Sequence, residues 1–203
     1  MKKPCVTRFA SNFKMLESIL DVEDELRMLV ACTEWRGIAY SRTTAAVNTT
    51  NIIQKPEFWA VGNEVKKVLE PLVCVLRLVD GDGSTSAYLY EALERAREGI
   101  KAFVSENPSR YSRILQLFEV RRKENLIHEV HGAAAFLNPA FLNKANFIET
   151  TEMKEGINYM VEFLVAEEKK FDFLREVQQY RMKKQTLFTP TAVSMLQTAH
   201  PRK

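Results

Sequence analysis

Apolar residues recur every three or four positions along almost the whole chain, and this spacing restricts the fold more than any other feature. Such a spacing lines up apolar side chains on one face of a helix. The longest example comprises Phe58, Val61, Val65, Val68, Leu69, Leu72, Leu76 and Val79. Apolar and polar residues nowhere alternate over six positions, and only 7 glycines are present for tight turns. We therefore predict an all-α fold, an irregular multi-helix bundle with little or no β-structure.

Prolines and small polar residues indicate where these helices begin, bend and end. Asn107, Asn138 and Thr189 each precede a proline, which pairs a capping side chain with proline in the first helical position. Pro71 lies inside the longest apolar stripe, so a kink or a break is expected just before it.

Two segments are expected to connect helices instead of forming them. Residues 41–51 are rich in Thr, Ala and Asn and predict a loop or weak linker. Residues 79–84 predict a turn between two long helices. A further apolar stripe, from Met153 to Tyr180, predicts helices beyond them.

The size, charge and cysteine content indicate a soluble intracellular protein. With 203 residues and 46% hydrophobic residues, the chain can bury a core without metal or disulfide support. Cys5, Cys32 and Cys74 are widely spaced and odd in number, which favours a reducing compartment. The strongest apolar stretch, residues 71–79, is too short to span a bilayer, so no membrane association is expected.

Two patterns resemble metal sites, but each has a simpler interpretation. Asp80, Asp82, Ser84 and Glu91 match positions of a calcium-binding loop, but Thr85 stands where that loop needs glycine. We expect an ordinary turn there, with Ser84 or Ser86 capping the next helix.

The second pattern is the pair His128 and His131, which are three residues apart and suit one helix face. No nearby cysteine completes a zinc site, so packing or capping is the expected role of both histidines. Neither a metal nor another cofactor is therefore predicted, and no small-molecule substrate is evident. The sequence also lacks a phosphate-binding loop, a dinucleotide-binding glycine motif and a nucleophile elbow, so no catalytic residues are predicted.

Short basic clusters and two tryptophans are the features most relevant to nucleic acid. The net charge of +3 permits such contact without requiring it. The clusters are Lys2-Lys3, Arg121-Arg122-Lys123, Lys169-Lys170 and Lys183-Lys184, and we expect them on exposed helix faces. Trp35 and Trp59 could stack on bases, although Trp59 lies beside the apolar stripe and is expected in the core.

The order of several short motifs resembles the plant-type branch of the hAT transposases. The resemblance covers roughly residues 6–142, and the remainder matches weakly. The motifs are TRFASNF (7–13), EW (34–35), YS (40–41), FW (58–59), VLEPLV (68–73), VLRLVDG (75–81), YLYEA (88–92) and HGAAAFLNP (131–139).

The resemblance implies a ribonuclease-H-like superfamily protein whose catalytic domain carries three acidic metal ligands, interrupted by a large helical insertion. This chain matches the insertion, so the three acids would lie outside it and the chain would not be an enzyme. The domains implied are an N-terminal extension (1–6), an insertion-like domain (7–185) and a marginally ordered C-terminal segment (186–203). Nuclear location is implied as well.

One functional pair of the family can be carried over to this chain. An arginine and an aromatic residue at the start of the insertion map onto Arg8 and Phe9, and would contact a phosphate and an extruded base near a DNA end. In the alternative interpretation, Phe9 packs with Phe13 and Leu16 on the apolar face of the first helix.

Three hypotheses follow from these observations. The first is a truncated, transposable-element-derived and catalytically inactive protein that retains DNA-end binding. The second is a helical protein-interaction module, with a protein partner or a second copy of itself and no nucleic-acid binding. The third is a gene fragment without a selected role.

Overall fold

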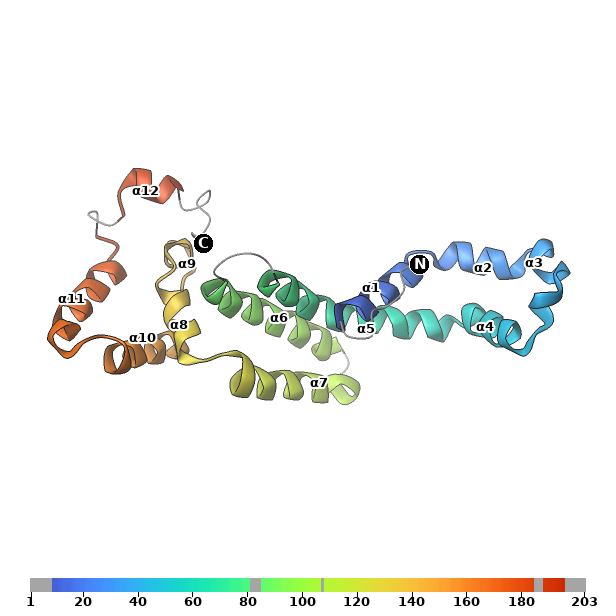
Figure 1. Cartoon of the computed structure of the whole chain (residues 1–203), viewed down its shortest axis with the longest axis horizontal. Helices are drawn as coiled ribbons and strands as arrows, with labels where there is room; N and C mark the ends of the chain where they lie inside the picture. Colours follow the sequence, from blue (N-terminus) through green and yellow to red (C-terminus); the bar gives the residue numbers. More distant parts are fainter. Residues whose placement is uncertain (1–8, 81–84, 107, 185–187, 196–203) are drawn as a thin grey trace. The chain divides into compact units, whose positions relative to one another are not determined.

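The computed structural model describes residues 9–80, 85–106, 108–184 and 188–195, and these residues fold into helices and the turns between them. No strand occurs within these ranges, so the predicted all-α, multi-helix fold is confirmed. Figure 1 shows the helices in chain order. Two compact units are distinguished, Met1–Leu76 and Arg77–Lys203.

The first unit is built around two helices that lie side by side and are joined by short helical turns (Figure 1). The elements are α1 (Phe9–Leu20), α2 (Glu23–Ala31), α3 (Thr33–Gly37), the 3₁₀ turn η1 (Ala39–Arg42), α4 (Thr44–Gln54) and α5 (Pro56–Val79). Helices α2 and α4 are the pair, and α3 with η1 connects them. Phe13, Val30 and Trp59 are each less than 5% exposed, so they anchor the packing of this unit.

The expected loop at residues 41–51 is wrong, because most of that segment forms α4. Thr43 caps the helix: its side-chain oxygen accepts a hydrogen bond from the Ala46 N–H at 3.3 Å. Ala46 is only 3% exposed, and α4 contacts both α2 and η1, so burial within the unit stabilises a segment whose threonines and asparagines have weak helix propensity. Tertiary contacts and the Thr43 cap thus stabilise α4 in spite of the weak helix propensity of its residues.

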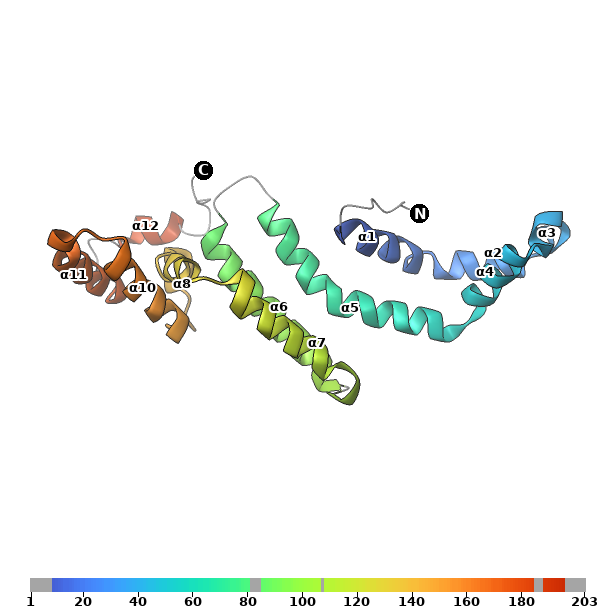
Figure 2. The same ribbon diagram turned by 60° about the horizontal axis from the view of Figure 1, so that its bottom comes forward.

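Pro71 does not split the long apolar helix, because α5 continues from Pro56 to Val79 with Pro71 inside it. Proline removes one backbone hydrogen bond and crowds the preceding turn, which bends a helix without necessarily ending it. Figure 2 shows α5 changing direction along its length. The expected kink is therefore compatible with the structure, while the expected break is not.

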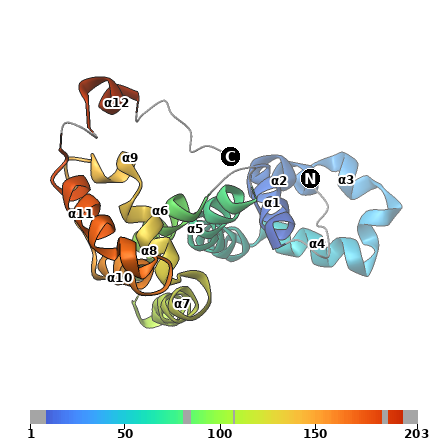
Figure 3. The ribbon, with the colours of Figure 1, turned by 60° about the vertical axis from the view of Figure 1, so that its left-hand side comes forward.

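The second unit contains the larger core. Its elements are α6 (Ser86–Glu106), α7 (Pro108–Arg121), the π-helical turn η2 (Arg122–Leu126), α8 (Glu129–Phe136), α9 (Pro139–Leu142), α10 (Thr151–Phe163), the 3₁₀ turn η3 (Glu167–Lys169), α11 (Lys170–Arg181) and α12 (Pro190–Met195). Helix α8 lies between α6 and α10 (Figure 3). Phe136 is fully buried, and Tyr90, Met153 and Ile157 pack around it in the same cluster.

Two glycines allow α8 and α10 to come into close contact. A Cβ atom on Gly132 would overlap the Glu152 carbonyl, and one on Gly156 would overlap the Ala133 N–H. Small residues at a helix crossing bring the backbones together, which explains why the apolar HGAAAF segment becomes the centre of this unit.

The prolines predicted to begin helices do so. Pro108, Pro139 and Pro190 are the first residues of α7, α9 and α12. The Asn138 side chain accepts from the Ala140 N–H at 3.0 Å, and the Thr189 side chain accepts from the Ala192 N–H at 3.1 Å. Asn107 lies outside the described residues, so its capping role stays a prediction.

The stripe from Met153 to Tyr180 is buried only in part. Met153, Ile157 and Val177 are below 10% exposed, in keeping with a core-facing stripe. Phe171, in contrast, is 77% exposed, and Leu164 is 60% exposed. The pattern therefore predicts the helices correctly but not which of their apolar side chains are covered.

Candidate functional site

The connection between α2 and α4 holds Trp35 facing α4. The Cys32 thiol caps α3 by accepting a hydrogen bond from the Trp35 N–H at 3.4 Å, and its own hydrogen is donated to the Leu29 carbonyl at 3.0 Å. The Trp35 ring meets the Tyr40 ring edge to face, with 6.3 Å between centroids. These contacts fix the half-buried indole without covering it completely.

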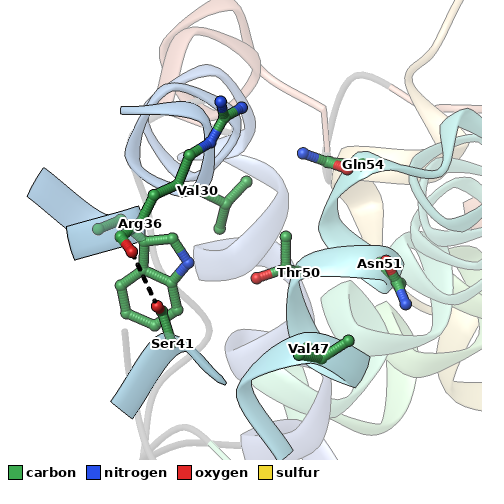
Figure 4. A pocket seen from close by; sticks show the side chains of 8 residues that line it. Val30, Arg36, Ser41, Val47, Thr50, Asn51 and Gln54 are labelled. Carbon is green, nitrogen blue, oxygen red and sulfur yellow. Dashed lines mark hydrogen bonds between the residues drawn. The ribbon is translucent and has the colours of Figure 1, made fainter. Parts of the chain in front are cut away.

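A cavity of about 210 Å³ lies beside this indole. It is lined by Val30, Trp35, Arg36, Ser41, Val47, Thr50, Asn51 and Gln54, which come from α2, α3, η1 and α4. Figure 4 shows the side chains of α4 on one side of this space and those of Arg36 and Ser41 on the other. The cavity is therefore lined by one aromatic ring, two valines and several polar groups, all from a single unit.

One face of α4 supplies half of the lining. Val47, Thr50, Asn51 and Gln54 are spaced at intervals of three, one and three residues, so their side chains share one face of the helix. In Figure 4 the Thr50 hydroxyl and the Gln54 amide point toward Arg36 and Ser41, whereas the Asn51 amide points away from them. The side chains of Thr50 and Gln54 thus face Arg36 and Ser41 across the cavity.

Most polar side chains of this cavity have unused hydrogen-bonding capacity. The side chains of Arg36, Thr50, Asn51 and Gln54 form no hydrogen bond or ion pair with the part of the chain that the structure describes. Ser41 differs, since its hydroxyl donates to the Ile38 carbonyl at 2.8 Å. Donors and acceptors are therefore available to a ligand beside the indole.

The second tryptophan has a structural role, as its sequence context predicts. Trp59 is 2% exposed, and its indole N–H donates to the Ile53 carbonyl at 2.8 Å. The Arg27 guanidinium lies over its ring, 5.7 Å from the centroid. Of the two stacking candidates that the sequence offers, Trp35 is the one that lines the cavity of about 210 Å³.

The size of the cavity limits what it can hold. Pockets for drug-sized ligands occupy roughly 300–1,000 Å³. At about 210 Å³ the Trp35 cavity is smaller, which suits a single flat ring system better than a large cofactor. An indole stacks on such a ring while nearby amide and hydroxyl groups bond its edge.

The second unit contains a polar cluster centred on Arg122. This residue belongs to a basic triplet that was expected on an exposed helix face, but it is only 5% exposed, so that expectation is wrong for Arg122. Its Nη1 and Nη2 donate to the two Glu152 carboxylate oxygens at 2.7 and 2.8 Å, and Nη2 also pairs with Glu94. The π-helical turn η2 begins at Arg122, in line with the side chain being directed inward toward these acids.

Tyr90 completes this cluster. Its hydroxyl donates to Glu152 at 2.7 Å and lies 2.9 Å from the Thr150 hydroxyl, while Arg122 stands over its ring. Burial raises the pKa of Tyr90 to about 12. Hydrogen bonds to Glu152 raise the pKa of Arg122, and the same bonds lower the pKa of Glu152, so the pair stays ionised.

A second cavity, of about 250 Å³, opens beside the cluster, but its charges offer less to a ligand. It is lined by Arg122, Lys123, Ile127, His128, Glu129, Glu152 and Glu155. Arg122 already binds Glu152 and Glu94, and the lining contains both acidic and basic side chains. This cluster is better understood as a structural ion-pair network than as a binding site.

The histidine pair caps a helix, as expected. The backbone N–H of His128, the N-cap of α8, donates to the His131 Nδ1 at 3.0 Å. The two rings stack with 5.7 Å between centroids. Burial, followed by the nearby His128, lowers the pKa of His131. Among the described residues, no group of three or more His, Cys, Asp or Glu side chains could hold a metal ion.

Other residues singled out from the sequence are placed only in part. Arg8, Asp82 and Ser84 lie outside the described residues, and Phe9 is described only as the first backbone position of α1. Glu91 pairs with Arg95 at 2.6 Å and with Lys144. No described helix is both long and apolar enough to cross a membrane.

The cavity beside Trp35 was not predicted as a unit. The sequence singles out Trp35 but predicts a loop over residues 41–51, the segment that supplies most of the side chains opposite it. The signal that could have found it is the spacing of Val47, Thr50, Asn51 and Gln54, which places them on one helix face. In comparisons with known proteins, no protein-family model, curated protein or solved structure matches this chain.

Proposed function

We propose that this chain is a transposase-derived, non-catalytic protein that binds DNA through the end of its first unit that carries Trp35. The observation behind the proposal is the Trp35 cavity, where an indole adjoins polar side chains without partners in the described structure. Aromatic stacking combined with free donors and acceptors is how proteins hold bases without reading a long sequence. The hAT resemblance supports the same partner and is itself part of the proposal, as is nuclear location.

Two cations stand close to this cavity. Arg36 lines it, and Arg42 lies at the end of η1; both are exposed and form no ion pair with other described residues. Each can neutralise one phosphate. Two phosphate contacts predict a modest salt dependence, with log K falling by about 1.8 per tenfold rise in salt for duplex DNA.

The test is a fluorescence anisotropy titration of labelled hairpin-ended and plain duplex DNA, at low and near-physiological salt. Trp35→Ala should weaken binding roughly tenfold through the loss of stacking. Phe171→Ala is the matched control, because it removes an aromatic side chain that is 77% exposed in the other unit. If the wild-type protein binds no DNA at low salt, or if both variants bind as wild type does, the proposal fails.

The Arg8-Phe9 contact proposed from the family resemblance can be measured in the same titration. Arg8→Ala and Phe9→Ala should weaken binding to the hairpin end more than binding to the plain duplex, since the pair is expected near a DNA end. Equal weakening for both DNAs, or none, would remove this pair from the proposal without affecting the role of Trp35.

A protein-interaction module is the second candidate, favoured by the exposed apolar side chains around α11. Phe163 and Phe171 are 73% and 77% exposed, and Leu164 and Leu174 are 60% and 47% exposed. Exposed apolar side chains that form one contiguous patch are typical of contact sites. Light scattering should then give a mass that rises with concentration and falls for Phe163→Ser with Phe171→Ser. Tyr40→Ser, at 61% exposed in the other unit, is the control.

A further inference from the structure

We infer that an exposed apolar surface at the end of α10 and on the outer face of α11 binds a basic amphipathic helix of a partner protein. The inference rests on the second candidate function and names the chemistry of the partner. It concerns the second unit and is independent of DNA binding at Trp35. The side chains of this surface, which we call the α11 surface, are Phe163, Leu164, Phe171 and Leu174.

Helix α11 carries apolar side chains on two faces, although its own core uses only one. Val177 is 3% exposed, and Phe173 and Tyr180 pack against the same core. Phe171 and Leu174 lie one turn apart on another face and are 77% and 47% exposed. A surface helix normally presents charged or polar residues away from its core. The packing of the second unit therefore does not account for the outer apolar face of α11.

The end of α10 continues this exposed face. Phe163 is 73% exposed, and its ring packs on the Tyr159 ring with 4.9 Å between centroids, which holds it in place. The Lys170 ammonium at the start of α11 lies 3.8 Å from the Glu162 carboxylate near the end of α10. Phe171 and Phe163 directly follow these two residues in the chain, so they lie in the same region of the unit.

The charge around the α11 surface is negative. Residues 155–176 contain six acidic and three basic side chains, whereas the whole chain has a net charge of +3. Two of the three bases are paired within the segment, because Lys170 lies 2.7 Å from Glu167 and Arg175 lies 2.7 Å from Asp172. The α11 surface thus combines apolar side chains with an excess of carboxylates. The six acids, all exposed, are Glu155, Glu162, Glu167, Glu168, Asp172 and Glu176.

This negative charge selects among possible partners. DNA and anionic membrane surfaces carry phosphate groups, which the carboxylates repel. Addition of a partner strand needs a sheet edge, and the described residues contain no strand. A helix with an apolar face flanked by lysine or arginine matches both components, because its apolar side chains cover Phe171 and Leu174 while its cations meet the carboxylates.

The experiment uses the whole chain and three labelled synthetic peptides of equal length, with binding followed by fluorescence anisotropy. The first peptide is a helix with leucine on one face and lysine on the other. The second has glutamate in place of every lysine, and the third shuffles the first so that no apolar face forms. We expect the leucine–lysine helix to bind and the other two peptides to bind at least about tenfold more weakly. Equal binding of the lysine and glutamate helices overturns the inference.

Two double substitutions test where the peptide binds. Phe171→Ser with Leu174→Ser should weaken binding of the leucine–lysine helix at least about fivefold, because it removes the apolar contact. Met28→Ser with Leu29→Ser is the matched control, since these side chains are 65% and 50% exposed on α2 in the first unit. All four side chains are exposed, so both variants should keep the far-ultraviolet ellipticity of wild type. Equal peptide binding by the two variants contradicts the assignment to the α11 surface.

Charge reversal tests the acidic component. Glu168→Lys with Glu176→Lys should weaken binding of the leucine–lysine helix and strengthen binding of the leucine–glutamate helix. Glu57→Lys with Glu70→Lys makes the same change of charge on α5 in the first unit and is the control. If the two double variants bind both peptides alike, the carboxylates of the α11 surface do not select the partner, and the inference fails.

Light scattering distinguishes failure of this inference from failure of the candidate function on which it rests. A mass that stays at one chain while the leucine–lysine helix binds supports a different protein as partner. A mass that rises with concentration and falls for Phe171→Ser with Leu174→Ser, without peptide binding, assigns the surface to a second copy. That result overturns the inference while the protein-interaction candidate stands. Absence of both peptide binding and self-association overturns the candidate as well.

Discussion

Arg122 and Glu152 form a bidentate ion pair within the second unit, with nitrogen–oxygen distances of 2.7 and 2.8 Å. The arginine begins the turn after α7, and the glutamate lies in the first turn of α10, thirty positions later in the chain. The pair ties together two segments on either side of α8. Because the guanidinium is 5% exposed, it depends on its acids far more than a surface arginine does.

Glu152→Ala should therefore destabilise the second unit strongly. It leaves a buried guanidinium with Glu94 as its remaining acid, which we expect to cost about 3 kcal/mol of unfolding free energy. Asp172→Ala is the control, since its partner Arg175 is 58% exposed, and the loss should stay below about 1 kcal/mol. Urea unfolding followed by circular dichroism measures both. Similar losses in the two variants would mean that burial adds nothing to this pair.

Acidification should weaken the cap of α8. The pKa of His131 is lowered below its ordinary value of 6.5 in the folded protein, so the neutral ring is the form that folding favours. The neutral His131 ring contributes its full stabilisation above the pKa of the unfolded state. This stabilisation is lost as the pH falls through the lower pKa of the folded state. His131→Asn keeps a side-chain acceptor that does not titrate. Between about pH 7.5 and about pH 5, wild type should lose more stability than this variant; parallel losses would contradict the assignment.

Gly156→Ala should disrupt the crossing of α8 and α10. The added methyl group would overlap backbone atoms of Ala133 and Glu129, which cannot move as a flexible side chain can. We expect a loss of at least about 1–3 kcal/mol in unfolding free energy. Gly37→Ala is the control, because nothing lies within 4 Å of its added methyl group. If the two substitutions have the same effect in thermal unfolding, the crossing is looser than described.

The two tryptophans should respond differently to substitution. Trp59→Phe removes a buried indole and its hydrogen bond to Ile53, so the first unit should lose about 1–3 kcal/mol. Trp35→Phe keeps an aromatic ring at a half-buried position and should cost less than about 1 kcal/mol. Denaturant unfolding of both variants checks this. A larger loss for Trp35→Phe would assign that ring to the fold instead of to a ligand.

Local signals predicted much of the fold. The pairing of Asn138 with Pro139, and of Thr189 with Pro190, requires only neighbouring residues, and each pair marks the start of a helix in the structure. The burial of Ile157 likewise follows from the spacing of the apolar stripe to which it belongs. Such features are determined within a few residues of the chain and are therefore visible in the sequence.

Features that depend on distant partners were not visible. Arg122 looks like any member of a basic triplet until Glu94 and Glu152 are brought beside it by the fold. The helix at residues 44–54 depends on the burial of Ala46 and on contacts with α2 and η1, which no local propensity encodes. The Trp35 cavity was missed for the same reason, because its aromatic and polar sides come from different helices.

The placement of Trp35 and Trp59 has a practical consequence. The sequence contains 2 tryptophans, and both lie in the first unit. Intrinsic indole emission therefore reports on that unit alone, whereas far-ultraviolet ellipticity sums the helices of both. Comparing the emission and ellipticity curves during unfolding shows whether the two units unfold in one cooperative transition or in separate transitions. The chain thus carries its own site-selective optical probe, without any added label.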